Sequence, residues 1–228
     1  MSKTQVIGGS PSKLLGLLAD QMHKLQHGVI TVRELELFLQ RKNPFAISDI
    51  QSEWQEFYRK HFRLEVDFSD VQIPEDIGGF ERIIFIPKGL KLNEVLKAFR
   101  RQFPAWSYTD GLDEDVIENI RQSDRNYVIR LRGQVEADDE LESLSAKQLE
   151  QEEINCVTLL ERLVFELKYW SETGQHLDVS NITLCAGSRS RDGHVPCVSW
   201  GADNSKLHID WCLPGHAIDR LRARQAVS

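Results

Sequence analysis

Apolar residues in the first 64 positions recur at intervals of three or four, which is the spacing of an amphipathic helix. The predicted helices span Pro11–Leu25, Thr31–Asn43 and Ser48–Phe62. Gly28 is expected to end the first helix and Pro44 the second, because glycine adopts the left-handed conformation and proline cannot continue a helix. Residues 1–64 are therefore predicted to form an N-terminal three-helix unit.

Residues 65–135 have a different pattern, in which short apolar or alternating runs predict strands. The expected strands are Phe80–Pro87, Ala105–Thr109 and Asn126–Arg132, and the expected helices are Leu90–Phe103 and Asp113–Ile120. A strand, a helix and further strands in this order predict a small central α/β layer with a mixed or antiparallel sheet.

The C-terminal part of the chain predicts one strong helix followed by three short strands. Thr158 and Glu161 form a capping box at the start of this helix, and Gly174 is expected to end it. Asp192-Gly193 and Asp203-Asn204-Ser205 separate the strands and have the chemistry of hairpin turns. We therefore expect a C-terminal helix plus a three-stranded antiparallel meander.

An acidic connector over residues 136–156 separates the central layer from this C-terminal unit, which covers residues 157–228. The connector holds eight acidic residues and one basic residue, and Ser145 is expected to cap a brief helix in it. Together the four segments predict an α+β fold.

The net charge of −7 disfavours nucleic acid as a partner, although local basic surfaces remain compatible with it.

Alternation along the three C-terminal strands predicts which side chains share a face. The predicted apolar face carries Ile182, Leu184, Val198, Trp200, Leu207, Ile209 and Trp211, and the opposite face carries Cys185, Cys197, His208, Asp210 and Cys212. Because thiolates and imidazoles are preferred zinc ligands, one hypothesis is a zinc-supported domain centred on Cys185, Cys197, His208 and Cys212. Buried, inert thiols are the alternative, since cysteine also packs as a small apolar residue.

The same face also suggests a nucleophilic enzyme site. His208 and Asp210 project together, and either Cys197 or Cys212 would supply the nucleophile. However, no cysteine stands at a predicted helix N-terminus, and no oxyanion-hole loop is evident. These absences favour a protein that is not an enzyme and leave the Cys/His alternative open.

Arginine and tryptophan residues near the C-terminus suggest binding instead of catalysis. The predicted contacts are Arg189, Arg191, Trp200, Trp211, Arg222 and Arg224. Guanidinium groups bind oxyanions, and aromatic residues are enriched in interfaces. The leading hypothesis is therefore a non-catalytic binding or regulatory protein with a protein or anionic partner. Alternatively, these arginines dock onto the chain's own acidic connector.

A third hypothesis is DNA binding by the first two helices, arranged as a helix-turn-helix. This N-terminal unit carries nine basic and six acidic residues, and Arg33, Arg41 and Lys42 favour contact with phosphates. Glu34 and Glu36 lie beside them and oppose that contact. A helical interaction module is the competing interpretation.

The number of cysteines and the hydropathy of the chain indicate in which cellular compartment the protein is expected. Four cysteines are too few for a disulfide scaffold, and no C-x-x-C pair occurs. The longest apolar runs, such as Ile83–Ile86, are far shorter than a membrane span, and Met1–Gly9 has no secretory signal pattern. We therefore expect a cytoplasmic protein with reduced thiols, no membrane partner and no cofactor other than zinc.

Several segments are specific enough to suggest a family. They read GVIT, NPF, EWQEFYRKHF, VQIP, TLLERLVFELKYWSETGQHLD, TLCAGSRSRDG, VSW and DWCLPG, and LRARQAVS closes the series. From about Leu15 to Ser228, their order resembles a family of uncharacterised proteins from the genomes of candidate-phylum bacteria. The resemblance implies a bacterial source and a colinear architecture, and it carries over no activity, cofactor or catalytic residue.

Overall fold

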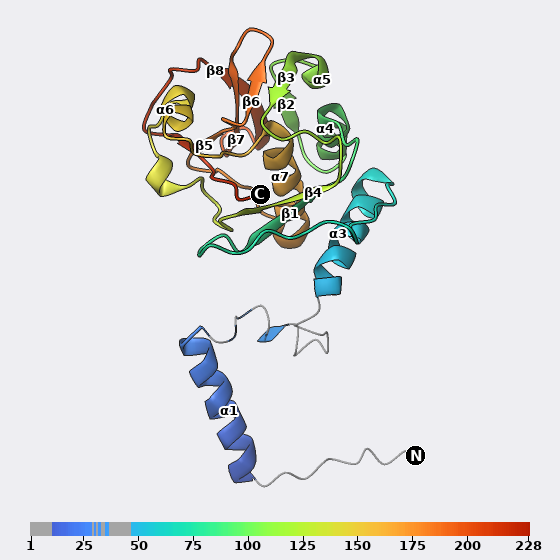
Figure 1. Ribbon diagram of the computed structural model, residues 1–228, viewed down its shortest axis with the longest axis vertical. Coiled ribbons are helices and arrows are strands. Elements are labelled where there is room, and N and C mark those ends of the chain that lie inside the picture. The colour runs from blue at the N-terminus through green and yellow to red at the C-terminus, as the bar shows by residue number, and fades with distance from the viewer. Residues whose placement is uncertain (1–10, 29, 31, 33–34, 37–46) are drawn as a thin grey trace. The chain divides into compact units, whose positions relative to one another are not determined.

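The computed structural model describes residues 11–28, 30, 32, 35–36 and 47–228 (Figure 1). The chain divides into two compact units, Met1–Glu53 and Trp54–Ser228. In the first unit, helix α1 spans Pro11–Gln26, and Gly28 follows it with a φ of 67°, as expected for a residue that ends a helix. The helix predicted at Thr31–Asn43 falls largely outside the described residues, and so do the cations behind the DNA-binding hypothesis.

The unit Trp54–Ser228 has an α+β fold (Figure 1). Its helices are the C-terminal part of α3 (Ile47–Phe62), then α4 (Leu92–Arg100), α5 (Leu112–Asp115), the 3₁₀ turn η1 (Asp139–Leu141), α6 (Ala146–Gln151) and α7 (Leu159–Thr173). Its strands are β1 (Arg82–Ile86), β2 (Ala105–Ser107), β3 (Val116–Asn119), β4 (Tyr127–Leu131), β5 (Ile182–Leu184), β6 (Ser188–Ser190), β7 (Val195–Gly201), β8 (Lys206–Cys212) and β9 (Leu221–Ala223). The predicted central layer, acidic connector and C-terminal part all lie within this one unit.

Five strands form a mixed sheet in the order β2-β8-β7-β5-β9. Its centre is the predicted meander, since β7 pairs antiparallel with both β5 and β8. The outer strands β2 and β9 pair in parallel, with β8 and β5 respectively. Two further antiparallel pairs, β1–β4 and β3–β6, lie outside this sheet. The meander is therefore the middle of a larger sheet.

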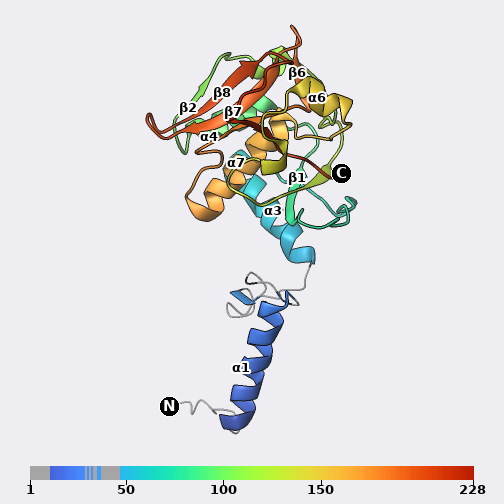
Figure 2. The ribbon, with the colours of Figure 1, turned by 90° about the vertical axis from the view of Figure 1, so that its left-hand side faces the viewer.

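Helices α4 and α7 lie against one face of the five-stranded sheet (Figure 2), and apolar side chains cover part of the other face. On one face, α7 contacts β7 and α4 contacts β2, while α7 also contacts β1. On the other face, η1 and α6 contribute to an apolar cluster with the sheet; its members include Leu141, Ala146, Leu149, Leu184, Cys197 and Cys212. Residues of both parities are therefore buried in the first part of β7, whereas on β8 Asp210 is exposed and His208 is partly exposed.

The predicted face assignment is confirmed for β7 and β8 and is wrong for β5. Leu184 lies opposite Cys197, and Thr183 lies opposite Val198, so alternation places Cys185 on the face of Val198. The reason is that β5 is buried on both sides, so its apolar residues do not distinguish the two faces.

The helix predicted at Asp113–Ile120 is also largely wrong. One helical turn, α5, ends at Asp115, and the chain continues as β3, which pairs with β6. Val116 and Ile117 are β-branched and suit a strand, but the pairing itself joins segments about 70 residues apart. A local sequence pattern does not report such pairing.

Helix α7 begins at the predicted capping box. The hydroxyl of Thr158 accepts from the Glu161 amide at 3.3 Å, and the Glu161 carboxylate accepts from the Thr158 amide at 2.7 Å. Arg121 binds the same carboxylate at 2.7 and 2.8 Å. Gly174 ends the helix in the left-handed conformation, with a φ of 70°. Since the cap is buried, its donors have no water to replace a lost partner.

We expect Thr158→Ala to lower the free energy of unfolding by about 1–2 kcal/mol, because the first turn of α7 loses a buried acceptor. Urea unfolding followed by far-ultraviolet circular dichroism measures the change. Thr158→Ser keeps the hydroxyl and should stay within about 0.5 kcal/mol of the parent protein. Equal losses in the two variants would assign the effect to the methyl group instead of the cap.

A cluster of buried ions connects α7 to the sheet. Arg162 donates to Asp178 at 2.9 Å and to Glu166 at 2.9 Å, and Arg224 donates to Asp178 at 2.7 Å. The hydroxyl of Thr183 donates to the same carboxylate of Asp178. Burial alone raises the pKa of Asp178, but the guanidinium groups of Arg224 and Arg162 outweigh it and hold that pKa below its ordinary value. Asp178 is therefore an ionised carboxylate shared by two buried arginines.

Aromatic side chains pack the C-terminal part of α3 against β1. Trp54, Tyr58, Phe68 and Phe85 are all buried, and the rings of Phe68 and Phe85 lie 4.9 Å apart between centroids. The hydroxyl of Tyr58 donates to the carbonyl of Phe85 at 2.6 Å. Trp54, Phe57 and Tyr58, which recur at helical spacing along α3, are thus part of the core.

Candidate functional site

A pocket of about 490 Å³ opens where β8, the loop after β2 and the β6–β7 hairpin meet. We call it the Trp211 pocket. It is lined by Tyr108, Thr109, Asp115, Ser190, Arg191, Asp192, His194, Asp210 and Trp211. Sites of about 300–1,000 Å³ typically hold small ligands, so this pocket has room for one ligand group or one long side chain.

Long-range backbone contacts hold the walls of the Trp211 pocket in place. Because β2 pairs in parallel with β8, the amide of Tyr108 donates to the carbonyl of Ile209 at 3.1 Å. The amide of Arg191 donates to the carbonyl of Asp115 at 3.0 Å and ties the β6–β7 hairpin to the end of α5. Gly193 has a φ of 77°, the left-handed conformation that lets this hairpin turn.

Carboxylates dominate the charge of the Trp211 pocket. Three aspartates line it together with one arginine, Arg191, whose guanidinium donates to the carbonyl of Glu114 at 3.3 Å. Within the described residues, the carboxylates of Asp115 and Asp192 have no hydrogen-bond or ion-pair partner. Among the residues that the structure describes, Asp210 accepts a hydrogen bond only from the amide of Trp211, at 2.8 Å. The pocket is therefore negatively charged and has free acceptors.

Aromatic rings form the apolar part of the same pocket. Tyr108 is 69% exposed, and Trp211 is half-buried. Trp106 lies next to Tyr108, with the ring centroids 6.4 Å apart, and is itself exposed. An aromatic face beside a carboxylate attracts a cation by two independent electrostatic effects, since the face of the ring is also negative.

Two of the six predicted binding residues, Arg191 and Trp211, meet in this pocket, and the other four lie elsewhere. Trp200 stacks on His176 with ring centroids 3.3 Å apart and contacts Phe103 at 5.8 Å. Its ring therefore belongs to the packing between the sheet and the segments around α4 and α7.

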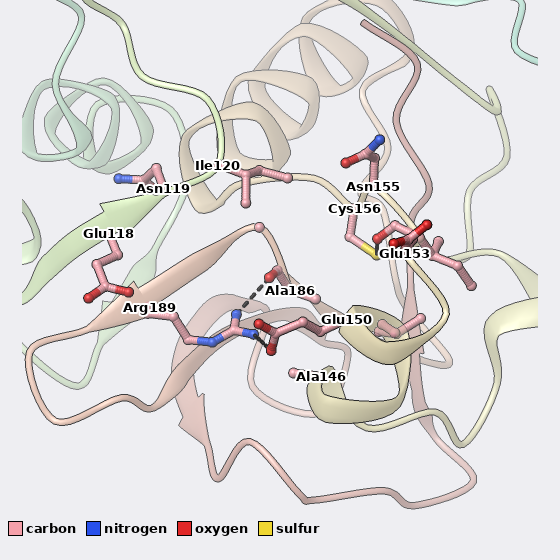
Figure 3. Close-up of a pocket in the computed structure, with 13 residues that line it drawn as sticks. Glu118, Asn119, Ile120, Ala146, Glu150, Glu153, Asn155, Cys156, Ala186 and Arg189 are labelled. Carbon is pink, nitrogen blue, oxygen red and sulfur yellow. Dashed lines mark hydrogen bonds and ion pairs between the residues drawn. The ribbon is translucent and has the colours of Figure 1, made fainter.

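Arg189 lines a second pocket of about 580 Å³ beside α6 (Figure 3). Its guanidinium donates to the carbonyls of Ala186 and Ser188 at 2.6 and 2.9 Å, and it lies 3.7 Å from the carboxylate of Glu150. Burial raises the pKa of the Cys156 thiol in this pocket to about 12. This pocket therefore offers neither a free arginine nor a nucleophile near neutral pH.

The arginines of β9 also bind within the chain. Arg222 forms ion pairs with Asp139 and with Glu142, the latter at 2.8 Å, so it docks onto the acidic connector. Arg224 is buried and donates to the carbonyl of Val135 at 2.6 Å as well as to Asp178. The two arginines are therefore not free to bind a partner, because Arg222 pairs with the acidic connector, as the alternative interpretation expected, and Arg224 is buried with partners inside the chain.

The four residues of the zinc hypothesis do not come together. Cys185 lies on the opposite face of the sheet from Cys197 and Cys212, whose sulfurs are 3.0 Å apart. His208 is bonded to the side chain of Asn204 through its Nε2 atom, at 3.0 Å. Within the described residues, no three His, Cys, Asp or Glu side chains are arranged to hold a metal ion.

The Cys–His–Asp alternative also lacks its central contact. His208 and Asp210 do share a face, as alternation predicts. Among the described residues, however, the partners of His208 are Asn204 and the ring of Trp106, at 5.8 Å between centroids, and no thiol lies within hydrogen-bond distance of it. Nothing in this arrangement activates a cysteine through His208.

Comparison with known proteins found no matching family model, no similar curated protein and no similar solved structure. The family resemblance in the sequence therefore stays a prediction.

None of the helices in the described part of the chain has the length and apolar character needed to cross a bilayer.

Proposed function

We propose that this chain is a non-catalytic binding protein and that its Trp211 pocket takes a positively charged amine or guanidinium group of a basic peptide. The observation that carries the proposal is the pair of carboxylates of Asp115 and Asp192, which have no partner in the described part of the chain and lie in one pocket with Tyr108 and Trp211.

The chemistry of the pocket fits a cation better than an anion. An ammonium or guanidinium group pairs with carboxylates and is attracted to the faces of aromatic rings. The three aspartates outnumber Arg191, the one arginine of the lining. The net charge of the chain, −7, adds long-range attraction for a basic partner.

An anionic partner finds less support. Arg189, Arg222 and Arg224 are engaged with carboxylates or carbonyls of the chain itself. A partner that used them would have to displace these contacts. Arg191 remains, and in this proposal it orients a carbonyl or hydroxyl oxygen next to the bound cation.

The test is calorimetric titration with acetyl-tetralysine amide, with acetyl-tetraglutamate amide as the anionic counterpart. We expect the lysine peptide to bind and the glutamate peptide not to bind. The double variant Asp115→Asn plus Asp192→Asn should bind the lysine peptide about tenfold more weakly, which corresponds to about 1.4 kcal/mol. Binding should also weaken as salt is added.

The matched control removes two carboxylates elsewhere. Asp203→Asn plus Asp219→Asn changes exposed residues outside the pocket and gives the same net charge as the pocket variant. Its affinity should stay within twofold of the parent protein. If the two double variants lose affinity equally, general charge attraction explains the binding and the pocket proposal is wrong. Preference for the glutamate peptide would also reject it.

A further inference from the structure

Two of the four cysteines face each other across the central strands of the sheet. The sulfurs of Cys197 and Cys212 are 3.0 Å apart, within hydrogen-bond distance. Cys156, in the segment before α7, belongs to the same apolar cluster, and Cys185 lies on the opposite face of the sheet, but neither thiol is hydrogen-bonded to the pair. The chain therefore contains one close pair of thiols and two separate thiols.

The register of β7 and β8 explains the close pair. Cys197 lies opposite Asp210, and Val195 lies opposite Cys212, so the two cysteines are diagonal neighbours on one face. Apolar side chains from η1 and α6 cover this face, and both thiols are buried, with 6% and 8% of their surface exposed. A disulfide bond is about 2.0 Å long, so the sulfurs need to approach by about 1 Å.

Cys212 is the nucleophilic member of the pair. Its hydrogen bond with Cys197 lowers the pKa of Cys212, and His216 acts in the same direction, whereas burial opposes both. The same hydrogen bond and burial raise the pKa of Cys197. His216 lies in the turn after β8, where its amide donates to the carbonyl of Leu213 at 2.9 Å. The thiolate, which is the reactive form, therefore forms more readily at Cys212 than at Cys197.

We propose that Cys197 and Cys212 form an oxidation site, at which hydrogen peroxide converts the two thiols into an intramolecular disulfide. The thiolate of Cys212 attacks one peroxide oxygen, and the O–O bond breaks. Hydroxide departs, and Cys212 becomes a sulfenic acid. The sulfur of Cys197 then attacks the sulfur of Cys212, and the S–O bond breaks. The departing hydroxide takes the proton of Cys197, so two thiols and one peroxide yield one disulfide and two waters.

The proposal does not depend on the function of the Trp211 pocket, and mass spectrometry tests it directly. The folded protein is treated with hydrogen peroxide, unreacted thiols are alkylated in denaturant, and the chain is digested with trypsin. Cleavage after Arg191, Lys206 and Arg220 places Cys197 and Cys212 in separate peptides. We expect a disulfide that joins these two peptides, and we expect Cys156 and Cys185 to remain alkylated.

Variants separate the two steps. Cys197→Ala should stop the reaction at a sulfenic acid on Cys212, which dimedone traps, and Cys212→Ala should leave Cys197 alkylated. Cys156→Ser is the matched control and should form the linked peptides at the parent rate. If Cys197 and Cys212 stay as fully alkylated as Cys156 in the parent protein, the proposal is wrong. Oxidation of Cys212 beyond sulfenic acid without linkage would also overturn it, and neither result depends on a variant that folds.

Discussion

Replacement of Asp178 by alanine is expected to lower the free energy of unfolding by about 3–5 kcal/mol. The carboxylate of Asp178 is fully buried and binds both Arg162 and Arg224, which are themselves buried. Without it, Arg224 loses its only ion pair among the described residues, and Arg162 keeps only its contact with Glu166. A buried charge without a partner costs more free energy than the intact buried ion pair contributes to stability. Urea unfolding monitored by tryptophan fluorescence measures the loss.

Two further variants distinguish the charge from the shape of this side chain. Asp178→Asn preserves the volume and removes the charge, so it should still destabilise the protein by more than about 2 kcal/mol. Asp203→Ala, in the exposed turn between β7 and β8, should change stability by less than about 0.5 kcal/mol. A loss at Asp178→Asn no larger than that of Asp203→Ala would refute the role assigned to the buried ions.

The same carboxylate gives the stability a defined dependence on pH. Its pKa in the folded protein lies below the value of about 3.9 in the unfolded chain. The stabilising contribution of Asp178 is therefore complete above about pH 3.9, and it is lost as the pH falls through the lower folded pKa. Asp178→Asn lacks this titration, so its stability should fall less steeply in acid than that of the parent protein.

Replacement of Phe85 by alanine is the second change with a large expected effect, about 3–5 kcal/mol. The ring of Phe85 is fully buried and lies near the rings of Trp54 and Phe68, at 6.0 and 4.9 Å between centroids. The close-packed core cannot collapse around the cavity, because the backbone of β1 is fixed by its pairing with β4. Guanidinium unfolding provides the measurement.

Two control variants differ from Phe85→Ala, one in the size of the cavity that it leaves and the other in the exposure of the side chain that it removes. Phe85→Leu leaves a smaller cavity and should lose less than half as much stability as Phe85→Ala. Leu213→Ala removes an apolar side chain that is 63% exposed, and it should change stability by less than about 0.5 kcal/mol. Similar losses for Phe85→Ala and Leu213→Ala would show that the aromatic cluster is not a tightly packed core.

Local signals in the sequence predicted α4, α6 and α7, whereas the helix predicted at Asp113–Ile120 is a single turn. The capping boxes at Thr158 and Ser145 both form, and they set the starts of α7 and α6. This success has a physical reason, since a helix satisfies its backbone within itself and its caps lie a few residues away. The α+β class follows from the same local patterns, whereas the short strands β3, β6 and β9 were not predicted.

The features that failed depend on contacts between distant segments. Arg224 looks like a solvated charge in the sequence, yet its carboxylate partner is 46 positions earlier in the chain. In α7 the charges of Arg162 and Glu166 lie among apolar residues on every side. That pattern is the signal that was missed, since a charge within a buried helix needs an internal partner.

The Trp211 pocket was predicted only in part. Arg191 and Trp211 were recognised by residue type, because guanidinium and indole groups are common in binding sites. Tyr108 and Asp115 were not, because they reach the pocket only through the parallel pairing of β2 with β8 and through the hairpin contact with α5. The unpartnered carboxylates become visible only when the surrounding contacts are known.

If the Trp211 pocket binds a cation as proposed, the edge position of β2 has a consequence for how that cation enters and leaves. This strand has three residues and pairs with β8 alone, so few hydrogen bonds attach it. A transient detachment of β2 would carry the Tyr108 wall outward while the other four strands keep their pairing. The cation would then enter and leave through local opening of one strand, while the remainder of the sheet stays in place.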